Sequence, residues 1–275
     1  MKAADLIAFL EREARAMRVE ITRVRGSSPR EEGAVMVVSP MAMVGTIGGG
    51  QLEYMALDEA RKLLKLSQSS GFMDVPLGPE IGQCCGGRVE ITLTEMDSAA
   101  RANLVAEVEA QEAALPHVYV FGAGHVGRAL ASLFQHLPVR CLLVDSRTEE
   151  LGLSQANVEK RLTALPEAEV RGAPAGSAFI VLTHDHALDF LLTAEGLTRQ
   201  DARWVGMIGS ATKRVKFERF AQSECDGLSA AALHCPIGAG GSTDKRPEVI
   251  AAMVVADVMT ALTTVSVDQL VEVRT

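Results

Sequence analysis

The chain has 275 residues, 48% of them hydrophobic and 23% charged, which fits a soluble protein with a substantial core in one large or two smaller domains. Its net charge of -8 argues against nucleic acid as the main partner, because phosphate backbones bind clustered basic surfaces. Five cysteines without a regular spacing indicate a reducing compartment, and no apolar run approaches the ~20 residues that span a bilayer. We therefore expect a cytoplasmic protein that does not enter a membrane.

The first part of the chain, residues 1–97, predicts an α+β domain. Its N-terminal segment is an amphipathic helix that carries charges throughout, unlike a signal peptide. Runs of β-branched residues predict strands, and an apolar stripe at helical spacing predicts a helix. The expected strands are 19–26, 34–39 and 88–96, and the expected helix is 51–66.

The sequence pattern changes in the second part of the chain. Residues 98–116 are charged, rich in alanine and end at Pro116, so we interpret them as a linker helix. Residues 117–275 alternate short apolar runs with helical segments, which predicts a Rossmann-like domain with a doubly wound parallel sheet. The expected strands are 117–124, 139–145, 178–185, 203–209 and 233–238, and helices are expected after Gly124 and at 186–197, 211–222 and 246–262.

Two adjacent cysteines, Cys84 and Cys85, stand in the loop "IGQCCGG". Neighbouring thiols do not easily face one zinc ion, and they close only a strained disulfide ring. Because turn residues surround them, the loop is typical of a segment that presents sulfur to a ligand. The alternative is a small, buried and unreactive pair of cysteines.

The segment "GAGHVG" is a G-x-G-x-x-G motif between an apolar strand and an amphipathic helix. In a dinucleotide site Gly122 permits the tight turn, Gly124 lets a pyrophosphate approach, and Gly127 lets the helix pack on the strand. Asp145 ends the next strand, where a carboxylate bonds both ribose hydroxyls and disfavours a 2′-phosphate. This favours NAD-like over NADP-like ligands, although Arg147 nearby weakens the preference. The alternative is a fold that keeps its glycines for packing alone.

Two more segments follow predicted strands of the second part, at the sheet edge where such folds bind ligands. In "THDHALD", His184 and Asp185 are candidates for ligand contact, and Asp185 is also a candidate cap for the helix that begins at His186. A metal site here is disfavoured, because alternate residues of an extended chain point to opposite faces. In "GMIGSATK", Ser210 and Lys213 suit a phosphate-contact turn, with a plain strand-to-helix turn as the alternative.

A series of motifs extends from about residue 20 to about residue 260, namely "GSSPREEGA", "GTIGGGQLE", "GQCCGGRVEI", "FGAGHVGRAL", "THDHALD", "VGMIGS", "CPIG" and "KRPEVIA". Their content and order resemble the XdhC/CoxI family, the xanthine dehydrogenase accessory proteins. The acidic "REE" and the glycine-rich "GAGGSTDKRP" depart from the family pattern. The resemblance implies a protein without turnover of its own that binds the molybdenum cofactor (molybdopterin). It implies that the protein supports cofactor sulfuration with a cysteine desulfurase and delivers the cofactor to xanthine dehydrogenase or a related molybdenum hydroxylase.

The resemblance gives the cysteine loop a role, because molybdenum prefers soft sulfur ligands. A thiolate at Cys84 or Cys85 would contact or shield the metal, or hold a persulfide sulfur on its way to it. Both roles need a lowered thiol pKa, for which Arg30 and Arg88 are candidate cations. The other cysteines, Cys141, Cys225 and Cys235, lie in apolar strands or a polar loop, and we assign them no role.

The glycine run before the predicted helix 51–66 is the second candidate contact. Gly48, Gly49 and Gly50 lead into a helix N-terminus, which is a favourable seat for the terminal phosphate of the cofactor. Glu53 and Gln83 are candidates for hydrogen bonds to the pterin edge.

Two other functions remain open at this stage. An NAD-dependent oxidoreductase needs an acid–base group beside the nicotinamide, and His125, His184 or His186 would serve. A regulatory nucleotide sensor would bind a nucleotide without acting on a molybdenum enzyme. A homodimer is expected only because homodimers are the commonest oligomers.

Overall fold

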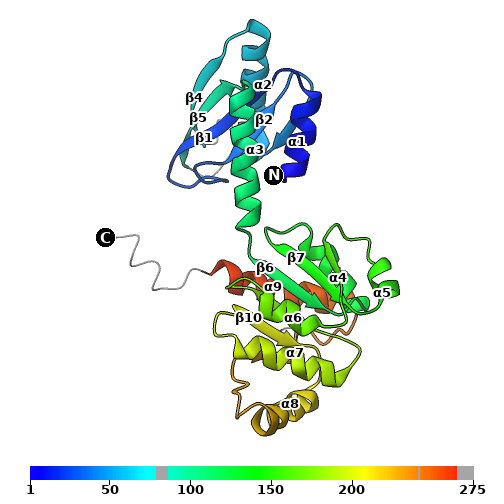
Figure 1. Cartoon of the computed structure of the whole chain (residues 1–275). Helices are drawn as coiled ribbons and strands as arrows, with labels where there is room; N and C mark the ends of the chain where they lie inside the picture. The colour runs from blue at the N-terminus through cyan, green and yellow to red at the C-terminus, as the bar shows by residue number, and fades with distance from the viewer. Residues whose placement is uncertain (79–85, 241, 265–275) are drawn as a thin grey trace. The chain divides into compact units, whose positions relative to one another are not determined.

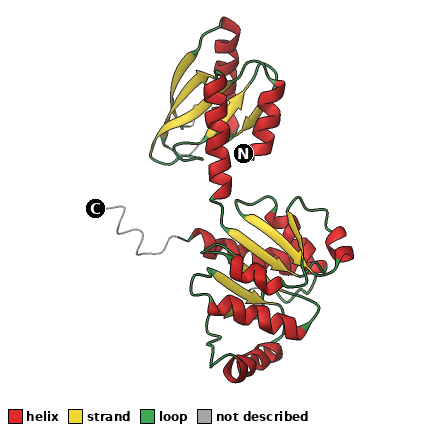
Figure 2. Ribbon diagram, viewed as in Figure 1, coloured by secondary structure: helices red, strands yellow, loops and turns green. Residues whose placement is uncertain are grey.

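The structure, a computed structural model, describes residues 1–78, 86–240 and 242–264. The chain forms two compact units, Met1–Ala114 and Leu115–Thr275, called unit 1 and unit 2 here (Figures 1 and 2). Each unit has its own β-sheet and its own hydrophobic core.

Unit 1 is built on a five-stranded sheet in which neighbouring strands are antiparallel. Side chains alternate between the two faces of a strand, so Met17, Val19 and Ile21 of the central strand point to one face and are buried there. In spatial order the strands are β3 (Met43–Gly45), β2 (Val35–Val38), β1 (Met17–Arg25), β5 (Arg88–Glu95) and β4 (Ser70–Pro76).

Helices cover both faces of this sheet (Figure 1). Helix α2 (Gly50–Leu66) buries its apolar stripe against the face that carries Met17 and Val19. Helices α1 (Ala3–Arg12) and α3 (Ser98–Ala113) pack on the other face, where they share a core with Val37. The apolar stripes in the sequence predicted α1 and α2 correctly.

Helix α3 lies within the segment interpreted as a linker, but it is packed into unit 1. Its buried residues Leu104 and Val108 contact the apolar side of α1. Arg101 donates to the carbonyl oxygens of Leu10, Glu13 and Ala14 at 2.8 to 3.0 Å. These carbonyls lie at the end of α1, where helical hydrogen bonds are missing, so Arg101 fastens one helix to the other.

Unit 2 contains a six-stranded parallel sheet. From β8 the order of strands is that of a dinucleotide-binding Rossmann fold, with the reversal of strand order between β6 and β9. In spatial order the strands are β8 (Glu159–Leu162), β7 (Arg140–Asp145), β6 (His117–Phe121), β9 (Ala178–Val181), β10 (Trp204–Met207) and β11 (Leu233–His234).

Helices pack on both faces of the parallel sheet and bury separate cores (Figure 2). One face carries α4 (His125–Phe134), α5 (Thr148–Gly152) and α9 (Pro247–Thr263). The other carries α6 (Pro166–Gly172), α7 (His186–Thr198) and α8 (Ala211–Glu224). The predicted fold class, an α+β part followed by a doubly wound Rossmann-like part, is confirmed.

Strands β3, β4 and β8 were not predicted from the sequence. Strand β3 has only three residues, too few to show a pattern. Strand β8 is polar and largely exposed, and β4 contains Gly71 and ends at Pro76, so neither has the apolar run of a central strand. Both are edge strands that pair on one side only. Within the described ranges, no helix is both long enough and apolar enough to cross a bilayer.

The contact between α1 and α3 generates a stability prediction. Arg101→Ala removes a charged donor from three carbonyls, and we expect unit 1 to lose about 2 kcal/mol of unfolding free energy. Circular dichroism would report a lower midpoint for part of the helical signal. Trp204, the only tryptophan of the chain, lies in unit 2, and its fluorescence transition should not move. Arg23→Ala, at an exposed strand position, is the control, and an equal shift in that variant would contradict the assignment.

Candidate functional site

The first candidate site lies at the carboxyl edge of the unit 2 sheet, where the strand order reverses between β6 and β9. The loops that follow β6, β7 and β9 enclose a small hollow there, lined by Gly122, Asp145 and His184 among others. Its volume of about 20 Å³ suffices for a water molecule only. A nucleotide would therefore lie above the hollow, against the glycine turn.

The three glycines of the G-x-G-x-x-G motif have different surroundings. Gly122 has φ +116°, and a Cβ atom there would lie 2.3 Å from the carbonyl oxygen of Leu182. A Cβ at Gly127 would lie 1.8 Å from the carbonyl oxygen of Gly122, so this glycine lets α4 approach the turn. A Cβ at Gly124 would meet nothing within 4 Å. The protein itself leaves the space beside Gly124 open, which fits the close approach of a ligand.

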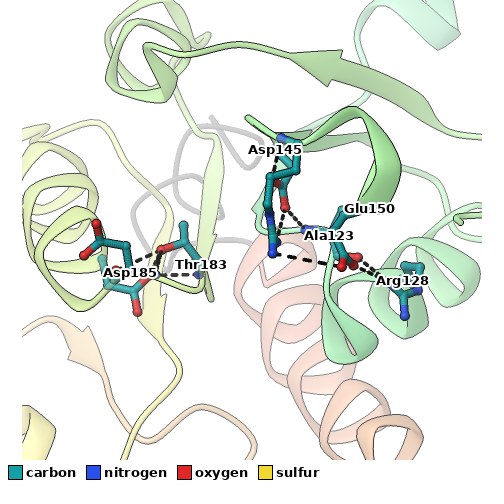
Figure 3. A network of polar contacts seen from close by, with 8 residues as sticks. Ala123, Arg128, Asp145, Glu150, Thr183 and Asp185 are labelled. Carbon is teal, nitrogen blue, oxygen red and sulfur yellow. Dashed lines mark hydrogen bonds and ion pairs between the residues drawn. The ribbon is translucent and has the colours of Figure 1, made fainter. Parts of the chain in front are cut away.

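The peptide of Ala123 holds the turn in place (Figure 3). Its N–H donates to Asp145 Oδ2 at 2.7 Å, and its carbonyl oxygen accepts from Arg128 Nη1 at 2.7 Å. Arg128 also pairs with Glu150 at 2.7 Å. Arg128 and Glu150 were not predicted as residues of this site, because the sequence does not reveal that their side chains form an ion pair beside the turn.

The Asp145 carboxylate is fully engaged in hydrogen bonds. Besides Ala123, it accepts from the Arg147 backbone N–H at 3.0 Å and from the Arg147 guanidinium at 3.0 and 2.9 Å. Burial alone would raise the pKa of Asp145, but the hydrogen bonds from Arg147 and Ala123 outweigh it and hold that pKa below its usual value. The residue predicted to receive ribose hydroxyls is thus an ionised carboxylate covered by a guanidinium.

A second polar network follows β9 and β10. Asp189, almost fully buried, accepts from the backbone N–H and the hydroxyl of Thr183 at 2.8 and 2.7 Å, and it pairs with the Lys213 ammonium. Lys213 is also buried, so its charge is neutralised inside the protein. Phosphate contact by Lys213 remains a prediction, and the pairing with Asp189 shows that its ammonium already has a structural partner.

The predicted helix cap at Asp185 is confirmed, and Ser210 caps the next helix in the same way. Asp185 accepts from the backbone N–H of Ala187 at 2.8 Å at the start of α7, and Ser210 accepts from that of Lys213 at 3.3 Å at the start of α8. In Figure 3, Thr183 and Asp185 lie next to one another. Ligand contact by either capping residue remains a prediction.

The histidines at this edge, His125, His184 and His186, are all exposed. Among the described residues, no group of three or more His, Cys, Asp or Glu side chains is arranged to hold a metal ion. Because they are exposed, these three histidines remain candidates for ligand contact.

The second candidate site lies in unit 1, where three loops converge. Ser27 forms a β-bridge with Gly86, and a Cβ at Gly26 would lie 3.2 Å from the Cα of Gly87. A Cβ at Gly48 would lie 2.8 Å from Pro29 Cγ. The loop "GSSPREEG" therefore touches both the glycine run and the residues that follow the cysteine motif.

The Glu53 side chain holds the backbone of the glycine run, residues 48–50, by hydrogen bonds. Its Oε2 accepts from the Thr46 hydroxyl and from the backbone N–H groups of Ile47 at 3.1 Å and Gly49 at 3.2 Å. A Cβ at Gly49 would meet nothing within 4 Å, so the outer side of the run is open. The Glu53 carboxylate is thus committed to the loop, and its charge opposes a phosphate at this helix start.

Two arginines and a serine hydroxyl lie beside the converging loops, and they differ in whether an ion pair or a hydrogen bond engages them. Arg88 forms a two-point ion pair with Asp74 at 2.5 and 2.7 Å. Arg30 is exposed and has no hydrogen bond or ion pair within the described ranges. The hydroxyl of Ser28 is buried and has no partner among the described residues. Of these two cations, Arg88 is paired with a carboxylate, whereas Arg30 has no such partner in the part of the chain that the structure describes.

The residues of the cysteine motif, Gln83, Cys84 and Cys85, lie outside the described residues. The described ends of their loop are tied together, with Leu77 and Gly86 joined by a backbone hydrogen bond of 2.9 Å. Burial raises the pKa of Cys141 to about 12 and also raises the pKa of Cys235. These two thiols are poor candidates for a soft-metal ligand, as expected for strand residues in a core.

Unit 2 thus has the strand order and the glycine turn of a dinucleotide-binding domain of Rossmann type. The space beside Gly124, at the carboxyl edge of its sheet, is not filled by protein atoms. Residues 118–258, more than half of the chain, match the XdhC Rossmann domain, and residues 9–74 match the XdhC and CoxI family. The chain belongs to the XdhC and CoxI family.

The chain is also similar to two other proteins. The uncharacterized protein YqeB of Escherichia coli (strain K12) is 26% identical over 253 residues, which are 87% of this chain. The chain spans only 42% of the length of YqeB. A crystal structure from Bacillus halodurans, described as a xanthine dehydrogenase, has a TM-score of 0.79 with 18% identity and covers 95% of this chain and 96% of its own. At that identity the likeness shows the fold alone.

The different surroundings of Gly124 and Gly127 predict different effects of an alanine at these two positions. Gly127→Ala forces Cβ against a backbone oxygen, so we expect a loss of about 3 kcal/mol in the stability of unit 2, reported by Trp204 fluorescence during denaturation. Gly124→Ala meets no protein atom and should fold normally, but it fills the space where a pyrophosphate would approach, so nucleotide affinity should fall at least tenfold. A destabilised Gly124→Ala protein would contradict this reading of the turn.

The buried ion pair generates a second stability prediction. Lys213→Ala leaves the Asp189 carboxylate buried without its partner, and we expect a loss of about 3 kcal/mol from unit 2. The double variant Lys213→Ala with Asp189→Asn should recover part of that loss, because the unpaired charge is removed. Lys216→Ala, at an exposed position of the same helix, is the control. Additive losses in the double variant would refute coupling between the two side chains.

Proposed function

We propose that this chain is an accessory protein that binds the molybdenum cofactor, supports its sulfuration and inserts it into xanthine dehydrogenase or a related molybdenum hydroxylase. Membership of the XdhC and CoxI family supports the proposal. The Bacillus halodurans protein of the same fold is described as a xanthine dehydrogenase, which is consistent with a connection to that enzyme. In this proposal the cofactor is cargo, and the chain binds it and hands it over without turnover of its own.

The convergence of the three loops of unit 1 is the observation that carries the proposal. It brings the glycine run, the loop around Arg30 and the base of the cysteine loop to one place. The open side of Gly49 leaves room for a bulky polar ligand, and the buried hydroxyl of Ser28, which has no partner among the described residues, adds hydrogen-bonding capacity. The cargo has matching parts, a polar pterin and a phosphate.

We propose separate roles for the residues of this convergence. Cys84 or Cys85 contacts the molybdenum or carries the incoming sulfur, because a thiolate is the soft ligand that this metal prefers. Arg30 meets the cofactor phosphate, since the Glu53 carboxylate makes the start of α2 unfavourable for an anion. Ser28 and Gln83 hydrogen-bond to the pterin. The backbone of Gly48, Gly49 and Gly50 shapes the wall of the site.

The proposed partners rest on the family alone. A cysteine desulfurase would supply the sulfur that replaces one oxo ligand of the metal. A molybdenum hydroxylase would receive the finished cofactor, and a homodimer is the proposed state of the carrier. The similarity to YqeB adds no support for these partners, because the chain covers less than half of the length of YqeB.

Nucleotide binding by unit 2 is the second function that we propose. The open space at Gly124, beside a turn that the side chains of Asp145 and Arg128 hold in place, supports it. Such binding would serve a nucleotide sensor that reports to the carrier, or an NAD-dependent oxidoreductase with His125, His184 or His186 as acid–base group. The two are distinguished by turnover, because an oxidoreductase changes the absorbance of the reduced nicotinamide when a substrate is added.

Cofactor retention tests the first proposal. The full-length protein is incubated with molybdenum cofactor and desalted, and bound molybdenum and pterin fluorescence are measured. We expect the wild type to retain both, at least one of Cys84→Ala and Cys85→Ala to lose most of the metal, and Arg30→Ala to bind at least tenfold more weakly.

Two matched controls accompany this experiment. Cys225→Ala removes a cysteine of unit 2, and Arg23→Ala removes an exposed arginine of unit 1. Both should retain the cofactor like the wild type. A wild-type protein without retained metal or pterin would refute cofactor binding, and full retention in both cysteine variants would refute the role of the motif.

A further inference from the structure

The Asp145–Arg147 pair changes what a nucleotide meets at the carboxyl edge of unit 2. In a site for NAD, the carboxylate that ends the second strand accepts hydrogen bonds from both ribose hydroxyls. Here each Asp145 oxygen already accepts two hydrogen bonds, from Arg147 and Ala123. A carboxylate has about four acceptor positions in total, so Asp145 has none left for a ribose diol.

The exposed group at this corner is the guanidinium. The Asp145 side chain is 4% exposed, whereas the Arg147 side chain is 36% exposed and lies over the carboxylate. Ser146, between them in sequence, is exposed and lines the same hollow as Asp145. A ligand that arrives beside Gly124 therefore meets an arginine fork and a hydroxyl, both of which donate hydrogen bonds.

Arg147 is also held from its other side. Its Nη1 lies 4.0 Å from Glu150, and Glu150 pairs with Arg128, which in turn donates to the carbonyl oxygen of Ala123. The guanidinium is thus oriented by a carboxylate on each side and linked to the glycine turn. Releasing Asp145 for a ribose diol would break a two-point ion pair, while a phosphate would use the arginine where it already is.

We infer that unit 2 selects dinucleotides whose adenosine ribose carries a 2′-phosphate over those with a free 2′,3′-diol, and that Arg147 determines this choice. The inference rests on the proposed nucleotide binding and names the ligand class of that site. It reverses the preference that Asp145 alone indicates in the sequence. Arg147 and Ser146 receive the 2′-phosphate, and Asp145 acts through Arg147 as a positioning residue.

Binding titrations with two matched pairs of nucleotides test the inference, using the full-length chain at fixed ionic strength. The first pair is NADP⁺ and NAD⁺, and the second is adenosine 2′,5′-bisphosphate and adenosine 5′-monophosphate. In the wild type we expect the 2′-phosphorylated member of each pair to bind at least tenfold more tightly. In Arg147→Ala the preference should invert, because the phosphate loses its donor and Asp145 becomes free for the diol.

Three variants separate specific contact from general effects. Arg147→Lys keeps the charge without the fork and should retain part of the preference. Arg171→Ala removes an exposed arginine of the same unit and should change neither affinity. Trp204 fluorescence during denaturation reports whether the Arg147 variants still fold, and if Arg147→Ala does not, the comparison with Arg147→Lys still measures the contribution of the fork.

The outcomes distinguish this inference from the proposals on which it rests. If wild-type protein binds NAD⁺ as tightly as NADP⁺ or more tightly, the inference is wrong while nucleotide binding stands. Equal losses in Arg147→Ala and Arg171→Ala would also overturn it, since the preference would then follow from overall charge. If no nucleotide binds, both the inference and nucleotide binding by unit 2 fail, and cofactor retention by unit 1 is judged by its own measurement.

Discussion

The backbone of Ala123 is the group on which the geometry of the glycine turn in unit 2 depends most. It is buried between two glycines, so its N–H and carbonyl oxygen both need partners inside the protein. Asp145 supplies one and Arg128 the other, and an unsatisfied group in this position would cost about 1 to 3 kcal/mol. Asp145 is therefore needed to form the turn before any ligand arrives, which is why its presence alone does not indicate a diol-binding residue.

Unit 1 uses a similar arrangement with different parts. Glu53 accepts from the glycine run as Asp145 accepts from the glycine turn, and each carboxylate stands behind a loop whose outer side is open at one glycine. A carboxylate in this position holds the loop, but it also adds negative charge where an anionic ligand would bind. Binding of an anion would therefore require a cation nearby, and Arg30 and Arg147 are the residues that we propose for this role in the two units.

Periodicity and turn residues predicted most of the central elements, and the motif context predicted the Rossmann fold. Elements without an apolar pattern were not predicted, as the polar edge strand β8 shows. Residues 98–116 were interpreted as a linker helix because they are charged and rich in alanine, whereas Leu104 and Val108 of α3 are buried in the core of unit 1. The site was harder to predict for a physical reason. Arg147 stands two residues from Asp145, but sequence does not reveal that its guanidinium folds back over the carboxylate. Likewise, the Lys213 ammonium binds Asp189 from another helix.

Local ion pairs, and not the net charge of the chain, would decide whether an anionic ligand binds. A protein of charge -8 repels anionic ligands at long range, yet at physiological ionic strength this repulsion is screened beyond ~8 Å. A phosphorylated ligand of the kind proposed above would then be selected within a few ångströms, by the donors that it contacts. Many arginines in the described ranges are neutralised by carboxylates at the surface, such as Arg88 by Asp74. In the proposed sites, the cations beside an open glycine loop, rather than the overall charge, would therefore determine which anions bind.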